Sequence, residues 1–130
     1  MPVIGMGGYF FRAADPQKLK AWYCEHLNVG GGCGVDEHGL SNEWLWINEG
    51  GPMVFEPFPK DTDYFPADRS AMINLRVRDL DDLIAQLRGG GIEVITKEEW
   101  NSPEVGRFAR IHDPEGNPVE LWEAAPKRSD

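Results

Sequence analysis

The stretch FARIHDPEGNPVEL, residues 108–121, decides the fold of this chain. It predicts two strands, 106–112 and 119–123, joined by the turn residues 113–118, which are rich in proline and glycine. A hairpin centred on Glu115 and Gly116 places Arg110 directly across from Glu120. A slip of one residue would turn either side chain to the opposite face of the sheet, so this register is the first expectation to test.

A faint internal repeat extends the pattern to the whole chain. Five identities recur at an offset of 64 residues: Arg12 and Arg76, Asp15 and Asp79, Leu19 and Leu83, Ile47 and Ile111, Glu56 and Glu120. Five matches alone prove little, but each half also has the same order of expected elements. Two similar units that complete one core place a candidate site on the pseudo-twofold axis between them.

Hydrophobic periodicity and turn residues give the expected elements of each half. A strand and a helix opened by Asp15 or Asp79 occur twice, each time followed by further strands, which predicts an α+β fold of two tandem βαβββ modules. The chain is then one domain, 1–130, with modules 1–60 and 71–125, and the polar connection 59–70 could cover a cleft. The expected strands are 9–13, 43–48 and 53–58 in the first half and 71–78, 92–95, 106–112 and 119–123 in the second.

Composition limits the partners. The 130 residues carry a net charge of −9, which argues against nucleic acid and anionic membranes and favours a cationic or neutral small ligand. No apolar run is long enough to span a membrane, and the first residues lack the pattern of a signal peptide. Two cysteines do not make a disulfide framework, so a cytoplasmic protein with reduced thiols is expected.

Three stretches together resemble the vicinal oxygen chelate superfamily, which includes glyoxalase I, bleomycin-resistance proteins and extradiol dioxygenases. They are residues 10–16 with Trp22 and Tyr23, residues 73–80, and residues 108–121, of which the last is the most specific. The resemblance implies a curved mixed sheet around a half-open cleft between the modules. It also implies a homodimer, because many members of the superfamily pair with the cleft near the subunit interface.

The resemblance also implies where a metal would bind. Metal-dependent relatives use four side chains, and the two last-strand positions fall on Glu56 and Glu120. The two first-strand positions fall on Gly8 and Met72, which supply no imidazole, and a thioether is a soft ligand unsuited to the usual divalent ions. The chain is thus expected to be a divergent member without a cofactor, with Glu56 and Glu120 as weak metal candidates.

The cleft contains candidate ligand-binding groups. Buried carboxylates need partners, and arginine provides a planar, two-pronged one. In glyoxalase-like relatives an arginine at the position of Arg12 contacts a substrate carboxylate, although an internal salt bridge is an equal alternative. If only one of the two glutamates is neutralised, the other could act as a catalytic base. The candidates are Glu56 and Glu120 as catalytic residues and Phe10, Arg12, Trp44, Trp46, Met72, Asn74, Arg76 and Arg110 as ligand-binding residues.

Three functions remain open, because one fold can host unrelated activities. The first is capture of a small organic molecule without turnover, as bleomycin-resistance proteins do. The second is a metal-dependent lyase or isomerase of the glyoxalase type that uses Glu56 and Glu120. The third is a non-catalytic dimeric scaffold. The missing imidazoles argue against glyoxalase I and dioxygenase activity, and the sequence identifies neither a substrate nor a reaction.

Overall fold

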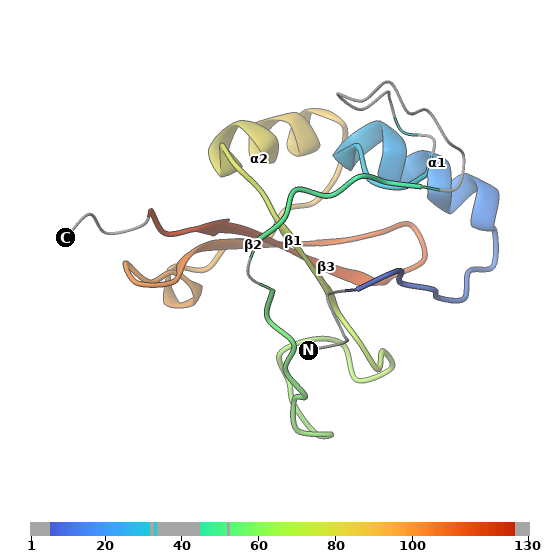
Figure 1. The fold of residues 1–130 in the computed structure, drawn as a ribbon. Helices are drawn as coiled ribbons and strands as arrows, with labels where there is room; N and C mark the ends of the chain where they lie inside the picture. Colours follow the sequence, from blue (N-terminus) through green and yellow to red (C-terminus); the bar gives the residue numbers. More distant parts are fainter. Residues whose placement is uncertain (1–5, 32, 34–44, 52, 127–130) are drawn as a thin grey trace.

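The computed structural model describes residues 6–31, 33, 45–51 and 53–126. Within them, three strands form a mixed sheet in the order β1-β3-β2, and both α-helices lie on one side of it (Figure 1). The α+β class is therefore confirmed. In chain order the elements are α1 (Pro16–Leu27), β1 (Ile73–Arg76), α2 (Leu80–Gly89), the 3₁₀ helix η1 (Glu98–Trp100), β2 (Gly106–His112) and β3 (Pro118–Ala124).

The predicted hairpin forms in the predicted register. β2 and β3 are antiparallel with Arg110 opposite Glu120, and β1 runs parallel to β3 with Asn74 beside Glu120. Asp113 closes the turn, because its Oδ1 accepts hydrogen bonds from the backbone N–H groups of Glu115 and Asn117. Gly116 lies in this turn at φ +84°, a conformation that glycine adopts without strain.

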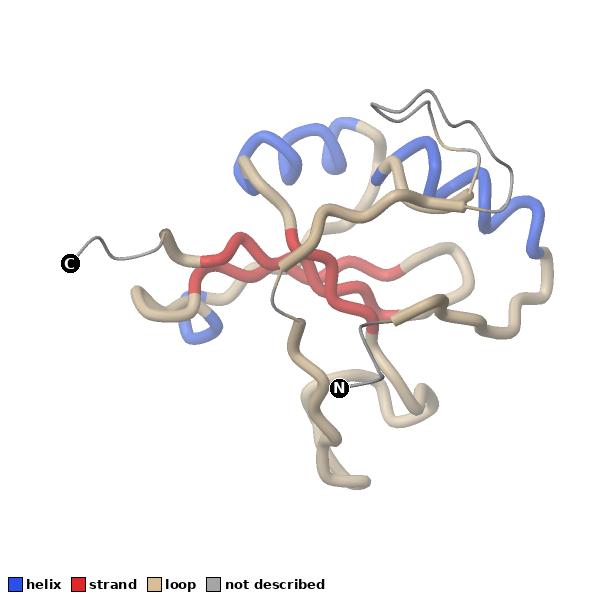
Figure 2. The backbone as a smooth tube through the Cα atoms, in the orientation of Figure 1, coloured by secondary structure: helices blue, strands red, loops and turns tan. Residues whose placement is uncertain are grey.

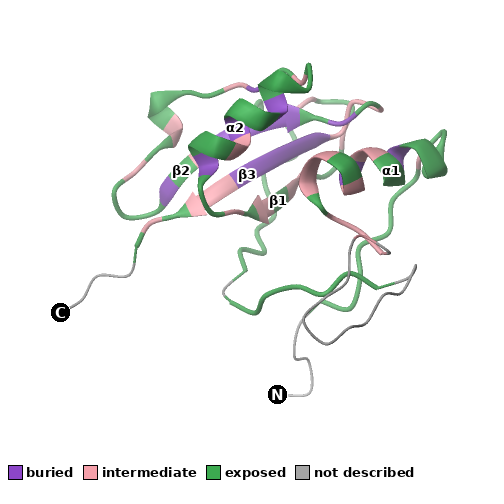
Figure 3. Cartoon of the chain, turned by 90° about the horizontal axis from the view of Figure 1, so that it is seen from above, coloured by how far each residue is buried: buried purple, intermediate pink, exposed green. Residues whose placement is uncertain are grey.

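The core lies between the sheet and the helices (Figure 3). Alternate residues of β2 and β3 point towards the helices and are fully buried, and α1 and α2 supply the facing side chains. Because side chains alternate along a strand, the residues between them belong to the opposite face of the sheet, called here the helix-free face because it carries no α-helix. The buried core consists of Leu19, Tyr23, Leu80, Ile84, Leu87, Val94, Ala109, Ile111, Val119 and Leu121.

The hairpin turn also fastens α1 to the sheet. The Tyr23 hydroxyl donates to Asp113 Oδ2 at 2.7 Å, and burial together with this carboxylate raises the pKa of Tyr23. The Glu115 carboxylate accepts from the backbone N–H groups of Ala14 and Asp15 at 2.6 and 3.0 Å. The most specific motif of the sequence thus joins the first half of the chain to the second.

The helix ends follow the predictions in part. Asp15 caps α1 by accepting from the Lys18 N–H, as expected, and the helix ends at Asn28 in a left-handed conformation. The predicted capping role of the Asp79 side chain is wrong, because Asp79 itself is left-handed and makes no capping hydrogen bond. The Glu123 carboxylate on β3 accepts from the Leu80 N–H instead, at 3.0 Å.

The two cysteines are not free. Cys24 and Cys33 form a disulfide, with Cα atoms 5.5 Å apart, so the expectation of reduced thiols is corrected. The turn after α1 explains the pairing. The Val29 N–H donates to the Tyr23 carbonyl and folds the chain back along the last helical turn, which brings residue 33 beside residue 24.

The strands predicted in the first half do not form. Residues 9–13, 45–48 and 53–58 lie in loops (Figure 2), and residues 43 and 44 fall outside the described part of the chain. In the second half, the predicted strand 92–95 contributes one bridge, from Ile95 to Arg110. Period-two apolar patterns favour a strand, but a strand also needs a paired edge for its backbone groups. The first-half segments find no such edge among the described residues.

We expect Tyr23→Phe to lower the free energy of unfolding by about 1–2 kcal/mol, because the buried Asp113 carboxylate loses a hydrogen-bond donor. Urea unfolding followed by circular dichroism measures the change. Tyr9→Phe is the matched control, since the Tyr9 side chain is half exposed, and it should change stability by less than about 0.5 kcal/mol. Equal effects of the two substitutions would contradict the role given to Asp113.

Candidate functional site

A polar cluster occupies the helix-free face of the sheet. Glu120 lies at the centre of β3, with Asn74 beside it on β1 and Arg110 beside it on β2. Glu120 and Arg110 are only 6% and 5% exposed, although neither α-helix covers this face. The connection between the two halves shields them, because Tyr64 lies over the cluster.

Each oxygen of the Glu120 carboxylate accepts one hydrogen bond. The Tyr64 hydroxyl donates to Oε2 at 2.5 Å, and the Asn74 amide donates to Oε1 at 2.8 Å. Arg110 Nη2 lies 3.8 Å from Oε2, which makes an ion pair without a hydrogen bond. Burial and the hydrogen bond to Glu120 raise the pKa of Tyr64 to about 12. A buried carboxylate is tolerated here because each of its oxygens has a donor.

Arg110 packs against two aromatic rings. Its guanidinium carbon lies 4.9 Å from the ring centroid of Tyr64 and 5.3 Å from that of Trp100. Its Nη1 also donates to the Tyr64 carbonyl at 3.0 Å. Cation–π contact and this hydrogen bond together hold the guanidinium between the β2 strand and the connection.

A hollow of about 630 Å³ opens beside the cluster. The connection residues 61–67 form one wall, Ile95, Lys97 and Trp100 form another, and Arg110 and His112 lie between them. This volume is within the range of sites for small organic molecules. The connection, which was expected to cover a cleft, does line one.

A second hollow of about 330 Å³ lies on the helix side of the sheet. Arg107, which lines it, donates to Asp81 at 2.6 Å and lies 3.7 Å from Glu123. Arg107 therefore already has acidic partners, and the walls of this hollow include no tyrosine or tryptophan. The larger hollow is therefore the candidate site.

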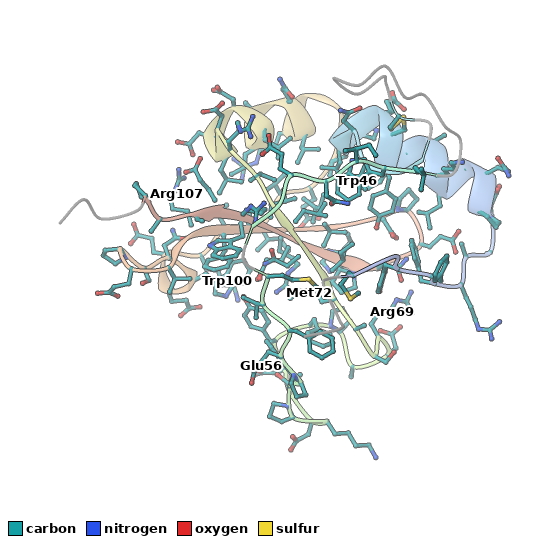
Figure 4. All side chains as sticks on the ribbon, viewed as in Figure 1. Trp46, Glu56, Arg69, Met72, Trp100 and Arg107 are labelled. Carbon is teal, nitrogen blue, oxygen red and sulfur yellow. A yellow bond between two sulfur atoms is a disulfide. The ribbon has the colours of Figure 1, made fainter. Side chains whose placement is uncertain are left out.

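The structure brings together three of the predicted site residues, Asn74, Arg110 and Glu120. Arg76 points elsewhere, since its Nη2 donates to the carbonyls of Glu49 and Gly50 at 3.2 and 3.3 Å. Met72 is half-buried and, like Trp100, lies on the helix-free side of the sheet (Figure 4).

The predicted site residues of the first half that the structure describes lie outside this cluster. Phe10 and Arg12 are exposed, and Trp46 lies at the level of the helices (Figure 4). Glu56 is exposed and points away from Met72 and Trp100 (Figure 4). Trp44 falls outside the described residues.

The sequence interpretation missed Tyr64 and Trp100. Both belong to polar segments without hydrophobic periodicity, where no strand or helix pattern fixes the direction of a side chain. The available signal was a large aromatic residue isolated among polar neighbours, as Trp100 is between Glu99 and Asn101.

The described side chains around Glu120 do not form a conventional metal-binding site. Within residues 6–31, 33, 45–51 and 53–126, no group of three or more His, Cys, Asp and Glu side chains is placed to hold an ion. Both oxygens of Glu120 accept hydrogen bonds from protein groups. A metal at this carboxylate would compete with the hydrogen bonds from Tyr64 and Asn74.

We expect stability to fall as the pH rises from about 10 to about 12, and Tyr64→Phe to reduce this loss. The pKa of Tyr64 is higher in the folded chain than its ordinary value near 10, so the unfolded chain loses the proton first as the pH rises. Urea unfolding at pH 9, 10 and 11 measures the slope for both proteins. Tyr23, whose pKa is also raised, keeps part of the slope in the variant. An unchanged slope would show that Tyr64 is not bound to Glu120 in solution.

A solved structure shows the same fold. TnmS3, an antibiotic-binding protein from Streptomyces sp. CB03234, matches with a TM-score of 0.54 at 23% identity, over 96% of this chain and 99% of its own. A glyoxalase/bleomycin resistance protein from the same organism is 31% identical over 48% of this chain and 54% of its own, with a TM-score of 0.32, too low to support an argument. No curated protein sequence matches the chain.

The sequence match covers most of the chain. Residues 9–122 match the family model of the glyoxalase-like domain, which includes the segments that carry Asn74, Arg110 and Glu120. The resemblance to the vicinal oxygen chelate superfamily is thereby confirmed. The chain belongs to the glyoxalase-like domain family.

Proposed function

We propose that the protein binds a small organic molecule with a flat apolar ring in the hollow beside Arg110, without a metal ion and without turnover. The observation that carries the proposal is the composition of this hollow. It combines the aromatic side chains of Tyr64, Phe65 and Trp100 with one buried cationic group, Arg110. Apolar walls with a few convergent polar groups are typical of sites that bind small molecules.

The state of Glu120 supports binding rather than catalysis. A catalytic base needs an oxygen that can reach the substrate, and both oxygens of this carboxylate are held by Tyr64 and Asn74. The alternative, a metal-dependent lyase or isomerase, needs Glu56 and Glu120 on one ion. The exposed position of Glu56 gives that alternative no support.

Likeness to TnmS3 is consistent with this proposal but does not carry it. That protein is an antibiotic-binding protein, so the fold is compatible with ligand capture. At 23% identity the likeness extends to the fold alone, and the ligand of this chain has to be inferred from its own hollow.

We further propose that the protein works as a homodimer in the cytoplasm. Phe10 and Phe55 are each 82% exposed, and Met6, Met53 and Val54 are more than half exposed. Exposed apolar side chains on this scale are uncommon on a monomer, and a second copy could cover them.

No helix of the described chain is both long and apolar enough to cross a membrane. The disulfide is the one observation against a cytoplasmic location.

We expect 2-naphthalenemethanol, a neutral flat probe, to raise the melting temperature of the protein. Ligand at about 100 times its Kd stabilises the folded state by about 2.7 kcal/mol, which a thermal-shift assay detects. Trp100→Ala should abolish the shift, because Trp100 lines the hollow, whereas the control Trp46→Ala should retain it.

The same assay tests the enzymatic alternative. Mg²⁺, Mn²⁺, Ni²⁺ and Zn²⁺ should leave the melting temperature unchanged. A metal-dependent rise that disappears in Glu120→Gln would contradict the proposal and favour the lyase or isomerase.

We expect light scattering after gel filtration to give twice the chain mass of 14.6 kDa. Phe55→Lys should shift the protein towards the monomer, because it places a charge in the exposed apolar segment. Val105→Lys, at an exposed apolar residue of the second half, is the control and should remain dimeric. A wild-type monomer at micromolar concentration would contradict the homodimer.

A further inference from the structure

We propose that the ligand is an organic anion and that Arg110 binds its carboxylate group through Nε and Nη2. This inference rests on the proposed function, since it names the chemical class of ligand for the same hollow. It also reverses the expectation from net charge, which favoured a cationic or neutral ligand.

The first observation is the set of unpaired donors on Arg110. Nη1 donates to the Tyr64 carbonyl, but Nε and Nη2 are buried and have no hydrogen-bond partner among the described residues. Buried donors of a charged group are strongly disfavoured when they stay unpaired. An acceptor that reached Nε and Nη2 from the hollow would remove this penalty, so the folded protein gains from binding one.

Glu120 cannot fill this role from its observed position. Its closest oxygen lies 3.8 Å from Arg110 Nη2, beyond hydrogen-bonding distance. That oxygen already accepts from the Tyr64 hydroxyl, and the other accepts from Asn74. Glu120 therefore balances part of the charge of Arg110, but it leaves Nε and Nη2 without a hydrogen-bond acceptor.

The second observation is the shape of the unpaired edge. Nε and one terminal nitrogen of a guanidinium form a planar fork that fits the two oxygens of a carboxylate. The rings of Tyr64 and Trp100 hold the guanidinium in place, so the fork is preorganised. A ring attached to the carboxylate would then contact the aromatic walls of the same hollow.

The other charged groups around the hollow are exposed. Lys97 lines it, and its ammonium lies 5.3 Å from the ring centroid of Trp100. The two acidic residues of the lining, Asp61 and Asp63, are exposed on the connection, so water screens all three of these charges and leaves Arg110 as the buried one. The buried charge of the hollow is therefore positive although the chain as a whole is acidic.

Three probes with the same ring system and different charge test the inference: 2-naphthoate, 2-naphthalenemethanol and 2-naphthylmethylammonium. Isothermal titration calorimetry on the full chain should show that the carboxylate binds at least about tenfold more tightly than the alcohol, with the ammonium weakest. Arg110→Met should remove this preference, so that the carboxylate binds no more tightly than the alcohol. Arg110→Lys keeps the charge but loses the fork, and should lose most of the preference.

The matched control is Arg107→Met. Arg107 lies on the same strand but on the helix side, where it pairs with Asp81, so the variant should keep the preference of the wild type. Equal affinity of the three probes, or tighter binding of the ammonium, would overturn the anion assignment and leave the proposed function standing. Failure of all three probes to bind the wild type would overturn both.

Discussion

The buried carboxylate of Asp113 is the constraint on which the rest of the structure depends. One of its oxygens accepts two backbone N–H groups of its own turn, and the other accepts the Tyr23 hydroxyl and the Asn117 amide. The same four-donor arrangement sets the hairpin and anchors α1. Because the turn fixes the register of β2 against β3, it also fixes which side chains face the helices and which face the candidate site.

The two faces of the hairpin have opposite roles. The helix side is apolar at Ala109, Ile111, Val119 and Leu121, which belong to the core, while the other side carries an ion pair at the centre of the sheet. Buried charges of this kind contribute little to stability by comparison with an apolar pair, and they are retained where they serve another purpose. Here Glu120 orients Tyr64 and Asn74. Arg110, which lines the hollow, has two N–H donors, on Nε and Nη2, without a hydrogen-bond partner among the described residues.

The sequence predicts those parts of the structure whose apolar residues follow a regular period along the chain. The hairpin, its register and the association of Asn74, Arg110 and Glu120 follow from a period of two and a recognisable turn, and both α-helices follow from apolar residues at helical spacing. Tyr64 and Trp100 could not be predicted as site residues, because loops place them and no repeat fixes their direction. The strands expected in the first half failed for a different reason. Their pattern was correct for pairing, but pairing depends on an edge elsewhere, which a single sequence does not reveal.

The connection between the two halves is both a covalent link and a wall of the hollow. Surface loops usually tolerate insertions and deletions, because little packs against them. This one is different, since Tyr64 supplies a donor to Glu120, an acceptor to Arg110 and a ring to the hollow. A change in loop length would therefore reshape the cavity while the sheet and helices stayed intact. Family members that share this scaffold could differ in the ligand they bind through changes in the length or sequence of this one connection.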